Sequence, residues 1–303
     1  MNVREIVTGD YARLESAGGF LQLYCRNVRR WIDEGAVSPA DCYIFEVGGA
    51  PVGGVCFCSY SEHECEILDF ALIDARAAYG AKSLKDAVRI AANADTKTIG
   101  YNLYDDTGQY ADLLRLFAHA GFRVAQEKKC YVYEKSDPPQ RIGTLLYRSV
   151  EQAGENVFTN AVKEVTVGTL DSSMSDDAAR LGGDIAAREY VDYMKKIDFN
   201  PDWWQLGYLG DQLVGLILPQ RFDAKRGGIN YVGVVPEHRG NGYGAALLAE
   251  GTRILCENSV KIIYADIDAR NHPLEAVLKQ VGYIFRMNES VLRLTLKNQD
   301  TLS

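Results

Sequence analysis

The sequence lacks any apolar run close to the ~20 residues that a membrane-spanning helix needs. Its first residues, MNVREIVTGDYARLE, contain no secretory apolar core. It also lacks C-x-x-C pairs: the seven cysteines are an odd number, and Cys56 and Cys58 alternate in an apolar stretch, which is typical of a buried strand. We therefore expect reduced, buried thiols, no metal site, no membrane partner and a cytoplasmic location.

Basic residues are too few for a nucleic-acid-binding surface. The chain has 33 Lys and Arg against 41 Asp and Glu, for a formal net charge of −8. This balance argues against a nucleic-acid partner and mildly favours cationic substrates. With 303 residues and 47% hydrophobic content, the chain is long enough for two domains or one large domain with a substantial core.

One stretch combines a strand, a glycine loop and a helix. The apolar, β-prone run from Ile229 to Val235 stops at a proline, and the sequence RGNGYG follows at residues 239–244. After the loop, apolar residues recur at helical spacing. Glycines allow backbone N–H groups to converge, and the start of the helix carries a positive partial charge. This stretch therefore suits a phosphate or pyrophosphate group.

Two other phosphate-binding loops do not match the stretch. A Walker loop requires Lys followed by Ser or Thr, where this sequence has Ala245 and Ala246. A dinucleotide-binding loop requires G-x-G-x-x-G, whereas the glycines here stand at 240, 242 and 244. The alternative that remains is an ordinary glycine-rich turn between a strand and a helix.

The pattern Arg-Gly-x-Gly-x-Gly after a strand that ends at Pro236 resembles the acetyl-coenzyme A loop of the GCN5-related N-acetyltransferase (GNAT) superfamily. In that family the loop amides hold the pyrophosphate, and the splayed strand before the loop pairs with the pantetheine arm. The resemblance implies acetyl-CoA as cofactor and direct attack of an amine on the thioester. The cofactor-binding residues that it implies are Val232, Val234, Arg239, Gly240, Asn241, Gly242, Tyr243, Gly244 and Asn271.

The segment after this helix follows the same family order. We expect a strand over 261–268 and a helix that starts at Asn271 and ends at Gly282. Two short strands are expected at 284–285 and 291–296. Asn271 is either a cofactor contact, a helix cap, or both. Many family members have a tyrosine as general acid where this chain has Leu278, so the acid is unassigned.

Two carboxylates are candidates for the general base that takes the proton from the amine. Asp266 and Asp268 alternate on the expected strand next to the cofactor strand, and so face the same side. The alternative for each is a solvated carboxylate at a strand end or a partner for the start of the next helix.

Two landmarks indicate that the domain is duplicated. Ala78-Tyr79-Gly80 precedes Gly242-Tyr243-Gly244 by 164 residues, and Gly121-Phe122 precedes Gly282-Tyr283 by 161 residues. We therefore predict an α/β (α+β) fold of two tandem GNAT domains, each with a mixed, mostly antiparallel sheet flanked by helices. The predicted domains are 1–137 and 138–303, joined by the polar, proline-bearing linker 135–140.

The first copy has a degenerate loop. Its sequence at residues 75–80 is ARAAYG, in which Arg76 and Ala78 replace two of the glycines. We predict that this copy does not bind acetyl-CoA and acts as a scaffold or as part of the substrate cleft. In the second copy, two helices over 151–167 and 175–195 are expected to cover the substrate entrance.

The sequence thus predicts an acetyl-CoA-dependent N-acetyltransferase (acyltransferase) that acts on the primary amine of a small molecule. Two alternatives stay open. One is a noncatalytic acyl-CoA-sensing or interaction module, which Leu278 favours. The other is an aminoacyl or thiol-conjugating transferase of the tandem type. The sequence predicts neither the acceptor nor the oligomeric state.

Overall fold

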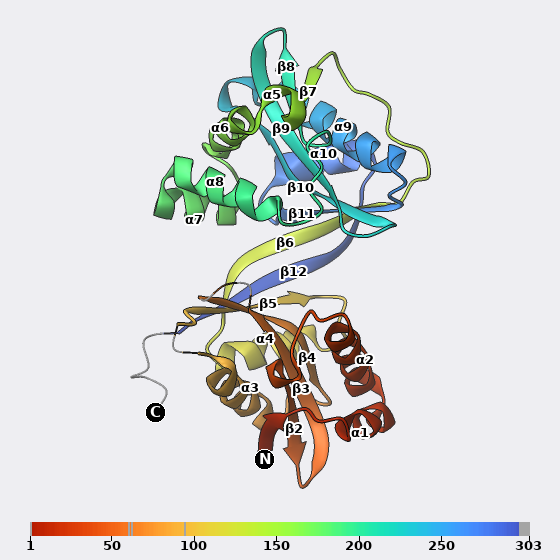
Figure 1. Ribbon diagram of the computed structural model, residues 1–303, viewed down its shortest axis with the longest axis vertical. Helices are drawn as coiled ribbons and strands as arrows, with labels where there is room; N and C mark the ends of the chain where they lie inside the picture. The colour runs from red at the N-terminus through yellow and green to blue at the C-terminus, as the bar shows by residue number, and fades with distance from the viewer. Residues whose placement is uncertain (1, 60, 62, 94, 297–303) are drawn as a thin grey trace. The chain divides into compact units, whose positions relative to one another are not determined.

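The computed structural model describes residues 2–59, 61, 63–93 and 95–296 (Figure 1). Its contacts divide the chain into two compact units. Unit 1 consists of Met1–Ala125 with Glu289–Ser303, and unit 2 is Gln126–Asn288. In the described part of the chain, no helix is long and apolar enough to cross a membrane.

Unit 1 is a sheet with helices packed against it. Its strands, in their order across the sheet, are β1 (Asn2–Glu5), β2 (Cys42–Val47), β3 (Ala50–Ser59), β4 (Glu64–Leu72), β5 (Thr98–Tyr104) and the last part of β12 (Ile284–Thr295). Its helical segments are α1 (Asp10–Ala17), α2 (Gly19–Asp33), η1 (Pro39–Asp41), α3 (Tyr79–Ala91) and α4 (Tyr110–His119). All neighbouring strands are antiparallel except β4 and β5, which are parallel because α3 forms the crossover between them.

Unit 2 repeats this arrangement. Its strands, in their order across the sheet, are β6 (Arg123–Tyr133), β11 (Ile262–Asp268), β10 (Arg226–Val234), β9 (Gln212–Arg221), β8 (Gln205–Leu209) and β7 (Leu146–Ser149). Its helical segments are α5 (Val150–Ala153), α6 (Glu155–Thr166), α7 (Ser172–Leu181), α8 (Gly183–Met194), η2 (Pro236–His238), α9 (Tyr243–Glu257) and α10 (His272–Val281). The one parallel pair, β10 and β11, again flanks a crossover helix, α9.

The predicted duplication is visible in the elements themselves. α3 and α9 both begin at the tyrosine of the loop, Tyr79 and Tyr243. α4 and α10 are both followed within two residues by a glycine in a positive-φ conformation, Gly121 and Gly282. The expected α/β fold of two similar domains is therefore confirmed.

The division between the units differs from the predicted boundary after Asp137. β6 crosses from unit 1 to unit 2 at Ala125, and the part of it over 128–133 pairs with β11 of unit 2. β12 crosses back, because its residues 289–295 pair with β5 of unit 1. Each unit thus receives its last strand from the other half of the sequence. The proline-bearing segment 135–140 lies inside unit 2 and is not a linker between the units.

Two expectations about single elements were wrong. The two helices expected over 151–167 and 175–195 are four segments, because Gly154 and Gly182 interrupt them with positive φ angles of 88° and 81°. The two short strands expected near the end of the sequence are one continuous strand, β12, which serves both units.

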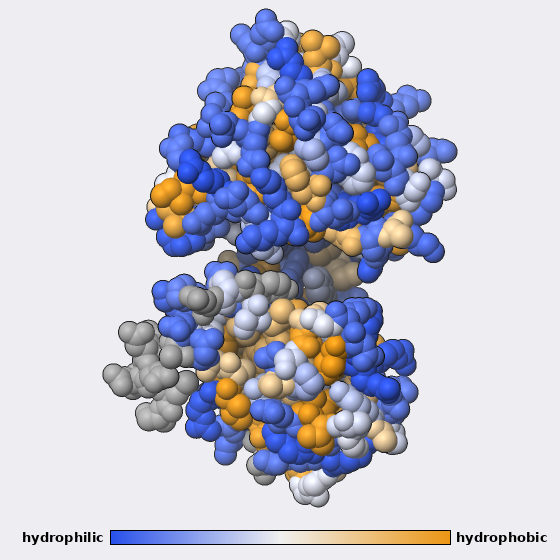
Figure 2. Space-filling view, viewed as in Figure 1, coloured by the Kyte–Doolittle hydropathy of each residue, from blue (hydrophilic) through white to orange (hydrophobic). Residues whose placement is uncertain are grey.

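The cores lie between the sheets and their helices. In unit 1, Phe45, Phe57 and Phe117 are buried, and in unit 2 Phe158 of α6 is buried against Trp204. Figure 2 shows that the viewed face of unit 2 is mostly hydrophilic, with small hydrophobic patches, one of them over the α7–α8 region. Ile185 on α8 belongs to the apolar side chains that remain exposed. Burial of the large apolar side chains therefore holds each unit together.

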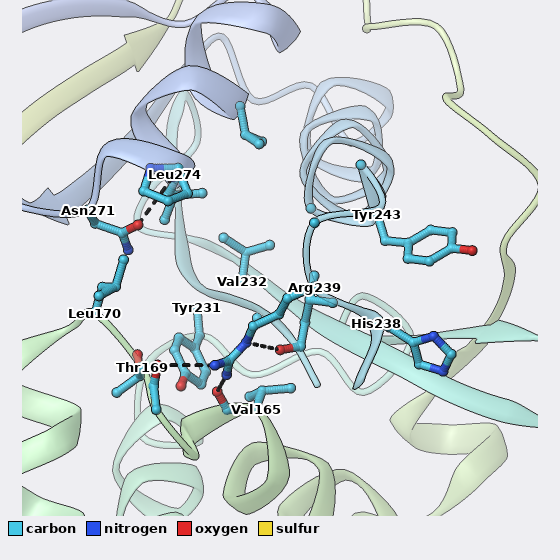
Figure 3. A pocket seen from close by; sticks show the side chains of 18 residues that line it. Val165, Thr169, Leu170, Tyr231, Val232, His238, Arg239, Tyr243, Asn271 and Leu274 are labelled. Atoms are coloured by element: carbon cyan, nitrogen blue, oxygen red, sulfur yellow. Dashed lines mark hydrogen bonds between the residues drawn. The ribbon is translucent and has the colours of Figure 1, made fainter. Parts of the chain in front are cut away.

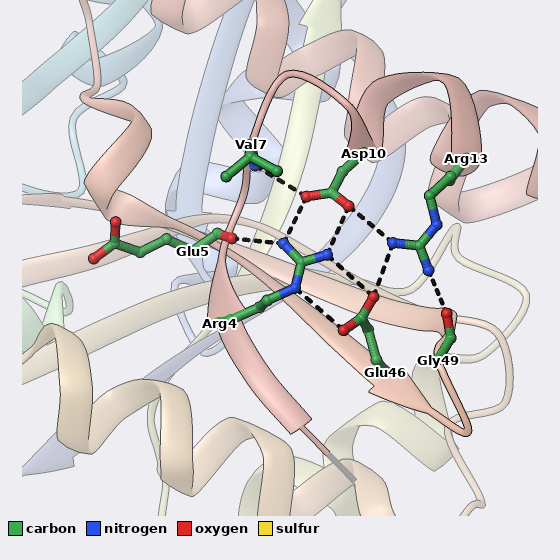
Figure 4. Close-up of polar contacts among 7 residues, drawn as sticks. All are labelled: Arg4, Glu5, Val7, Asp10, Arg13, Glu46 and Gly49. Atoms are coloured by element: carbon green, nitrogen blue, oxygen red, sulfur yellow. Dashed lines mark hydrogen bonds and ion pairs between the residues drawn. The ribbon is translucent and has the colours of Figure 1, made fainter.

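A partly buried ion-pair network fixes the first strand of unit 1. Arg4 on β1 donates from both Nη atoms to the Asp10 carboxylate, each at 2.7 Å, and also contacts Glu46 on β2 (Figure 4). Arg13 on α1 bridges the same two carboxylates. The hydrogen bonds from Arg4 outweigh desolvation and lower the pKa of Asp10 to about 2. The Asp10 side chain is 3% exposed, so solvent screens this network weakly.

We predict that this network makes unit 1 sensitive to acid. The ionised Asp10 contributes about 2 kcal/mol to stability at neutral pH, because its pKa is lower in the folded than in the unfolded chain. This contribution is complete above pH ~4 and is lost as the pH falls toward ~2. Urea denaturation followed from pH 7 to pH 2 should show the loss in the parent chain and a flatter profile in Asp10→Asn. Parallel profiles would contradict the prediction.

Candidate cofactor-binding and active site

The site in unit 2 begins where two parallel strands separate. β10 and β11 pair only over Arg226–Gly228 and Ile262–Tyr264. Beyond this point β10 follows β9, with a register shift between Ile229 and Tyr231, and β11 follows β6. The facing edges of β10 and β11 therefore diverge and leave backbone groups without a strand neighbour on that side.

A cavity of about 560 Å³ opens at this divergence (Figure 3). Its volume lies in the range of small-molecule and cofactor sites. Its walls come from the end of β10, the glycine loop with the first turn of α9, the start of α10, and the connection between α6 and α7. The residues that line it are Val165, Gly168, Thr169, Leu170, Tyr231, Val232, Gly233, Val234, His238, Arg239, Gly240, Gly242, Tyr243, Gly244, Asn271, Pro273, Leu274 and Val277.

The glycine loop presents free backbone donors to this cavity. Gly240 and Gly242 have φ angles of 79° and 81°, which explains why glycine is needed at both positions. Among the residues that the structure describes, none accepts a hydrogen bond from the backbone N–H groups of residues 240–244. These groups stand at the start of α9, where the helix dipole adds positive potential. The loop can therefore bind an anion.

The corresponding loop of unit 1 has three of its five backbone donors bonded within the loop. Asp74 accepts hydrogen bonds from the backbone N–H groups of Arg76 and Ala77, and Ala77 accepts from Gly80. Ala78, at the position of Gly242, has a right-handed φ of −58°, so the chain closes into ordinary turns. The difference between the two loops thus lies in backbone conformation as well as in the side chains that replace glycine.

The residues that cap α4 and α10 are also different. Asn271 caps α10: its Oδ1 accepts from the Leu274 N–H at 3.2 Å, and the residue lines the cavity. The expected cap is therefore present, and the Asn271 amide nitrogen is left for a ligand. At the same place in unit 1, Gln109 accepts from the Ala75 N–H at 2.8 Å and donates to the Leu72 carbonyl. Gln109 thus fills the position next to the loop of unit 1.

The Arg239 side chain is occupied by protein carbonyls. Its Nε donates to the Val234 carbonyl at 3.0 Å. Its Nη1 donates to Gly168, and its Nη2 donates to Val165 and Val167, at distances from 2.7 to 3.1 Å. Figure 3 shows the guanidinium group between the end of β10 and this carbonyl cluster. The Arg239 side chain thus bridges the glycine loop and the end of α6.

The two carboxylates predicted as bases have different surroundings. Both line a smaller cavity of about 60 Å³, which shares Thr169, Tyr231, Val232, Asn271 and Leu274 with the larger one. Asp268 is 2% exposed and accepts from Ser172 Oγ at 2.6 Å and from the Arg270 N–H at 3.0 Å. Burial opposes ionisation, but these hydrogen bonds prevail and lower the pKa of Asp268 to about 2. Asp266 remains exposed.

Tyr231 lies at the junction of the two cavities. The Tyr231 hydroxyl lies 3.0 Å from Thr166 Oγ1, which also donates to the Val162 carbonyl at 2.7 Å. Burial raises the pKa of Tyr231, and the phenol therefore stays protonated at neutral pH. In contrast, Leu278, at the position of the family's usual acid, is fully buried and apolar.

Comparison with known proteins identifies the family. The sequence model of the Acetyltransferase (GNAT) family matches residues 170–283, which lie within unit 2. An acetyltransferase of Photorhabdus laumondii is 33% identical over 106 residues, which are 34% of this chain and 71% of the relative. The chain belongs to the GNAT family of acetyltransferases. The resemblance to the GNAT superfamily that the glycine loop indicated is therefore confirmed.

Other relatives extend the similarity over more of this GNAT chain. A mycothiol acetyltransferase of Streptomyces scabiei is 25% identical over 206 residues, which cover 62% of this chain and 63% of the relative. This chain thus spans less than two thirds of that relative. A solved GNAT structure from Sphaerobacter thermophilus covers 97% of this chain and 95% of its own, at a TM-score of 0.64 and 17% identity.

A tandem GNAT protein from the clavulanic acid biosynthesis pathway shares the fold along the whole chain. It covers 99% of both chains with a TM-score of 0.55 and 12% identity. At such identities these two structures support the fold alone. Because they span both units, they agree with a chain made of two GNAT domains.

Most of the residues predicted to bind the cofactor line the larger cavity. Eight of the nine line it, and Asn241 does not. The Asn241 side chain instead donates to the His238 and Arg239 carbonyls and holds the loop in shape. Asp266 and Asp268 stay outside the larger cavity, as described above. The cavity wall at Val165 and residues 168–170 was not predicted, because no motif in the sequence marks the connection between α6 and α7.

Proposed function

We propose that unit 2 binds acetyl-CoA and transfers its acetyl group to the primary amine of a small molecule. The observation that supports this most directly is the row of free backbone N–H groups at residues 240–244 beside the 560 Å³ cavity. Unit 1 offers no comparable row, since three of the five equivalent amides are bonded internally. We therefore assign one cofactor site to the chain.

The residues of the cavity fit each part of the cofactor. The loop amides and the start of α9 suit the pyrophosphate. The backbone of Val232 and Val234, at the diverging edge of β10, suits the amide groups of the pantetheine arm. The Asn271 side-chain amide is a further donor at the same cavity. When bound, acetyl-CoA supplies an activated acetyl thioester.

Asp266 is the base that we assign to this reaction. Asp268 is a poor proton acceptor, because its carboxylate is buried, hydrogen-bonded to several donors and has a pKa of about 2. Asp266 points to the same side of β11 and lines the smaller cavity, and desolvation raises the pKa of its carboxylate, which makes it a better proton acceptor than Asp268. It can take a proton from an ammonium group before the neutral amine attacks.

Tyr231 is the proton donor that we assign in place of the missing tyrosine at position 278. It keeps its proton at neutral pH and lines both cavities. Its hydroxyl oxygen lies 3.0 Å from Thr166 Oγ1. A phenol at this junction can protonate a departing thiolate, as the mechanism requires.

The acceptor that we propose is a small cationic amine. The smaller cavity is lined by three aspartates, Asp171, Asp266 and Asp268, and the net charge of the chain is −8. Both features favour the approach of a positively charged molecule. One relative is named a mycothiol acetyltransferase, which agrees with a small molecule as acceptor.

An acetylation assay tests this function. The purified chain is incubated with acetyl-CoA and a panel of primary amines, and both free CoA and acetylated products are measured. We expect stoichiometric release of CoA and of an N-acetylated product with at least one amine. Binding of acetyl-CoA without turnover of any amine would favour the noncatalytic module that Leu278 suggests. Turnover only with thiols, or with aminoacyl donors, would favour an aminoacyl or thiol-conjugating transferase.

A further inference from the structure

We propose that Arg239 and Asp268 are positioning residues that hold the connecting segment Val167–Asp171 as a wall of the cofactor cavity. This inference rests on the proposed function, because it concerns the same cavity. It assigns to Arg239 a role other than phosphate binding and to Asp268 a role other than proton transfer.

The segment itself has little to fix it in place. It joins α6, which ends at Thr166, to α7, which begins at Ser172. Gly168 within it has a φ of 62°, and the side chains of Val167 and Leu170 are 60% and 49% exposed. Apolar burial therefore does not hold the segment, although Gly168, Thr169 and Leu170 line the cavity.

Arg239 holds the end of the segment next to α6. The guanidinium group uses four of its five N–H donors, one on the Val234 carbonyl and three on the carbonyls of Val165, Val167 and Gly168. The last carbonyls of a helix lack partners and carry a negative partial charge, so a cation is favoured there. A fork-shaped guanidinium satisfies several of them at once, which lysine cannot do.

Packing brings α6 close enough for this contact. A Cβ atom built on Gly233 of β10 would lie 2.8 Å from the Val165 side chain. Glycine at this position thus allows the end of α6 to lie directly on β10. The Arg239 side chain then reaches the α6 carbonyls from the loop that follows the same strand.

Asp268 holds the end of the segment next to α7. Its Oδ2 accepts from both the Oγ and the N–H of Ser172, at 2.6 and 3.3 Å. Its Oδ1 accepts from the backbone N–H of Arg270. The end of β11 is thereby joined to the first residue of α7. Both anchors come from elements that border the site, so the glycine loop and β11 together set the position of the wall.

Two ligands separate positioning by Arg239 from direct phosphate binding. Acetyl-CoA contains the pyrophosphate, and acetyl-pantetheine lacks it. If Arg239 positions the wall, Arg239→Gln raises the Kd of both ligands by a similar factor, about 10-fold. The reason is that the wall borders the pantetheine arm, which both ligands contain. A loss confined to acetyl-CoA would overturn the proposal. Arg239→Lys should lose nearly as much as Gln, whereas a phosphate-binding cation would tolerate lysine.

A second measurement does not depend on any ligand. Hydrogen exchange of the ligand-free chain should be faster across 167–172 in Arg239→Gln and in Asp268→Asn than in the parent chain. Arg226→Gln is the matched control: it also removes one positive charge, but at the start of β10, where Arg226 pairs with exposed Asp223. Unchanged exchange in both variants would overturn the proposal even if acetyl-CoA binds. If the parent chain binds neither ligand, the proposed function fails, and exchange still decides the role of the two residues.

Discussion

Gly244→Asp is expected to raise the Kd of acetyl-CoA by about 100-fold or more. Gly244 lines the cavity in the first turn of α9 and has no positive φ. A Cβ atom at this position would meet nothing closer than the Val277 side chain at 3.7 Å, so a larger residue fits without strain. The new carboxylate would stand among the loop amides and repel the pyrophosphate.

Gly244→Asn is the control for this prediction. It has the shape of Asp without the charge, and should weaken binding far less than Gly244→Asp does. A carboxylate at the start of a helix interacts favourably with the positive end of the helix dipole. The Asp variant should therefore be at least as stable to heat as the Asn variant. Equal Kd values for the two variants would contradict an electrostatic role of the loop. Isothermal titration of both variants gives the comparison.

Asp266→Asn is expected to have the largest effect on turnover. A correctly placed base contributes ~10²–10⁴-fold to the rate, so kcat should fall by that factor with an acceptor identified in the amine screen. The Kd of acetyl-CoA should stay nearly constant, because Asp266 does not line the larger cavity. The acidic limb of the pH profile of kcat/KM should also change.

Asp268→Asn provides the contrast for this prediction. The side chain has the same length and lies two residues away on the same face of β11. If Asp268 positions the wall, its variant should weaken cofactor binding and leave the pH profile in its original form. A kcat of Asp266→Asn within ~3-fold of the parent value would rule out Asp266 as the base.

The local parts of the site could be predicted from the sequence. The RGNGYG loop requires glycine at two positive-φ positions, and Asn271 stands where a helix cap is expected. Such features depend on the conformation of a few neighbouring residues, which the sequence specifies directly. The repeat of the loop and of the helix-ending glycines likewise predicted the duplicated fold.

The parts that depend on distant contacts could not be predicted. Nothing in residues 123–133 or 284–295 indicates that these strands complete the other unit, because pairing partners are chosen by tertiary structure. The use of Arg239 depends on the carbonyls of the α6 end, some seventy residues earlier in the chain. Asp266 and Asp268 look equivalent in the sequence, and the burial of Asp268 and its contacts with Ser172 and Arg270 separate them only in the structure.

The measurement that tests the central claim most directly is the number of acetyl-CoA molecules that each chain binds. Calorimetric titration of acetyl-CoA into the purified chain should give one site, because the loop of unit 2 has free amides and that of unit 1 is closed by Asp74 and Gln109. A stoichiometry of two, or the absence of binding, would contradict the assignment of a single working cofactor site to unit 2.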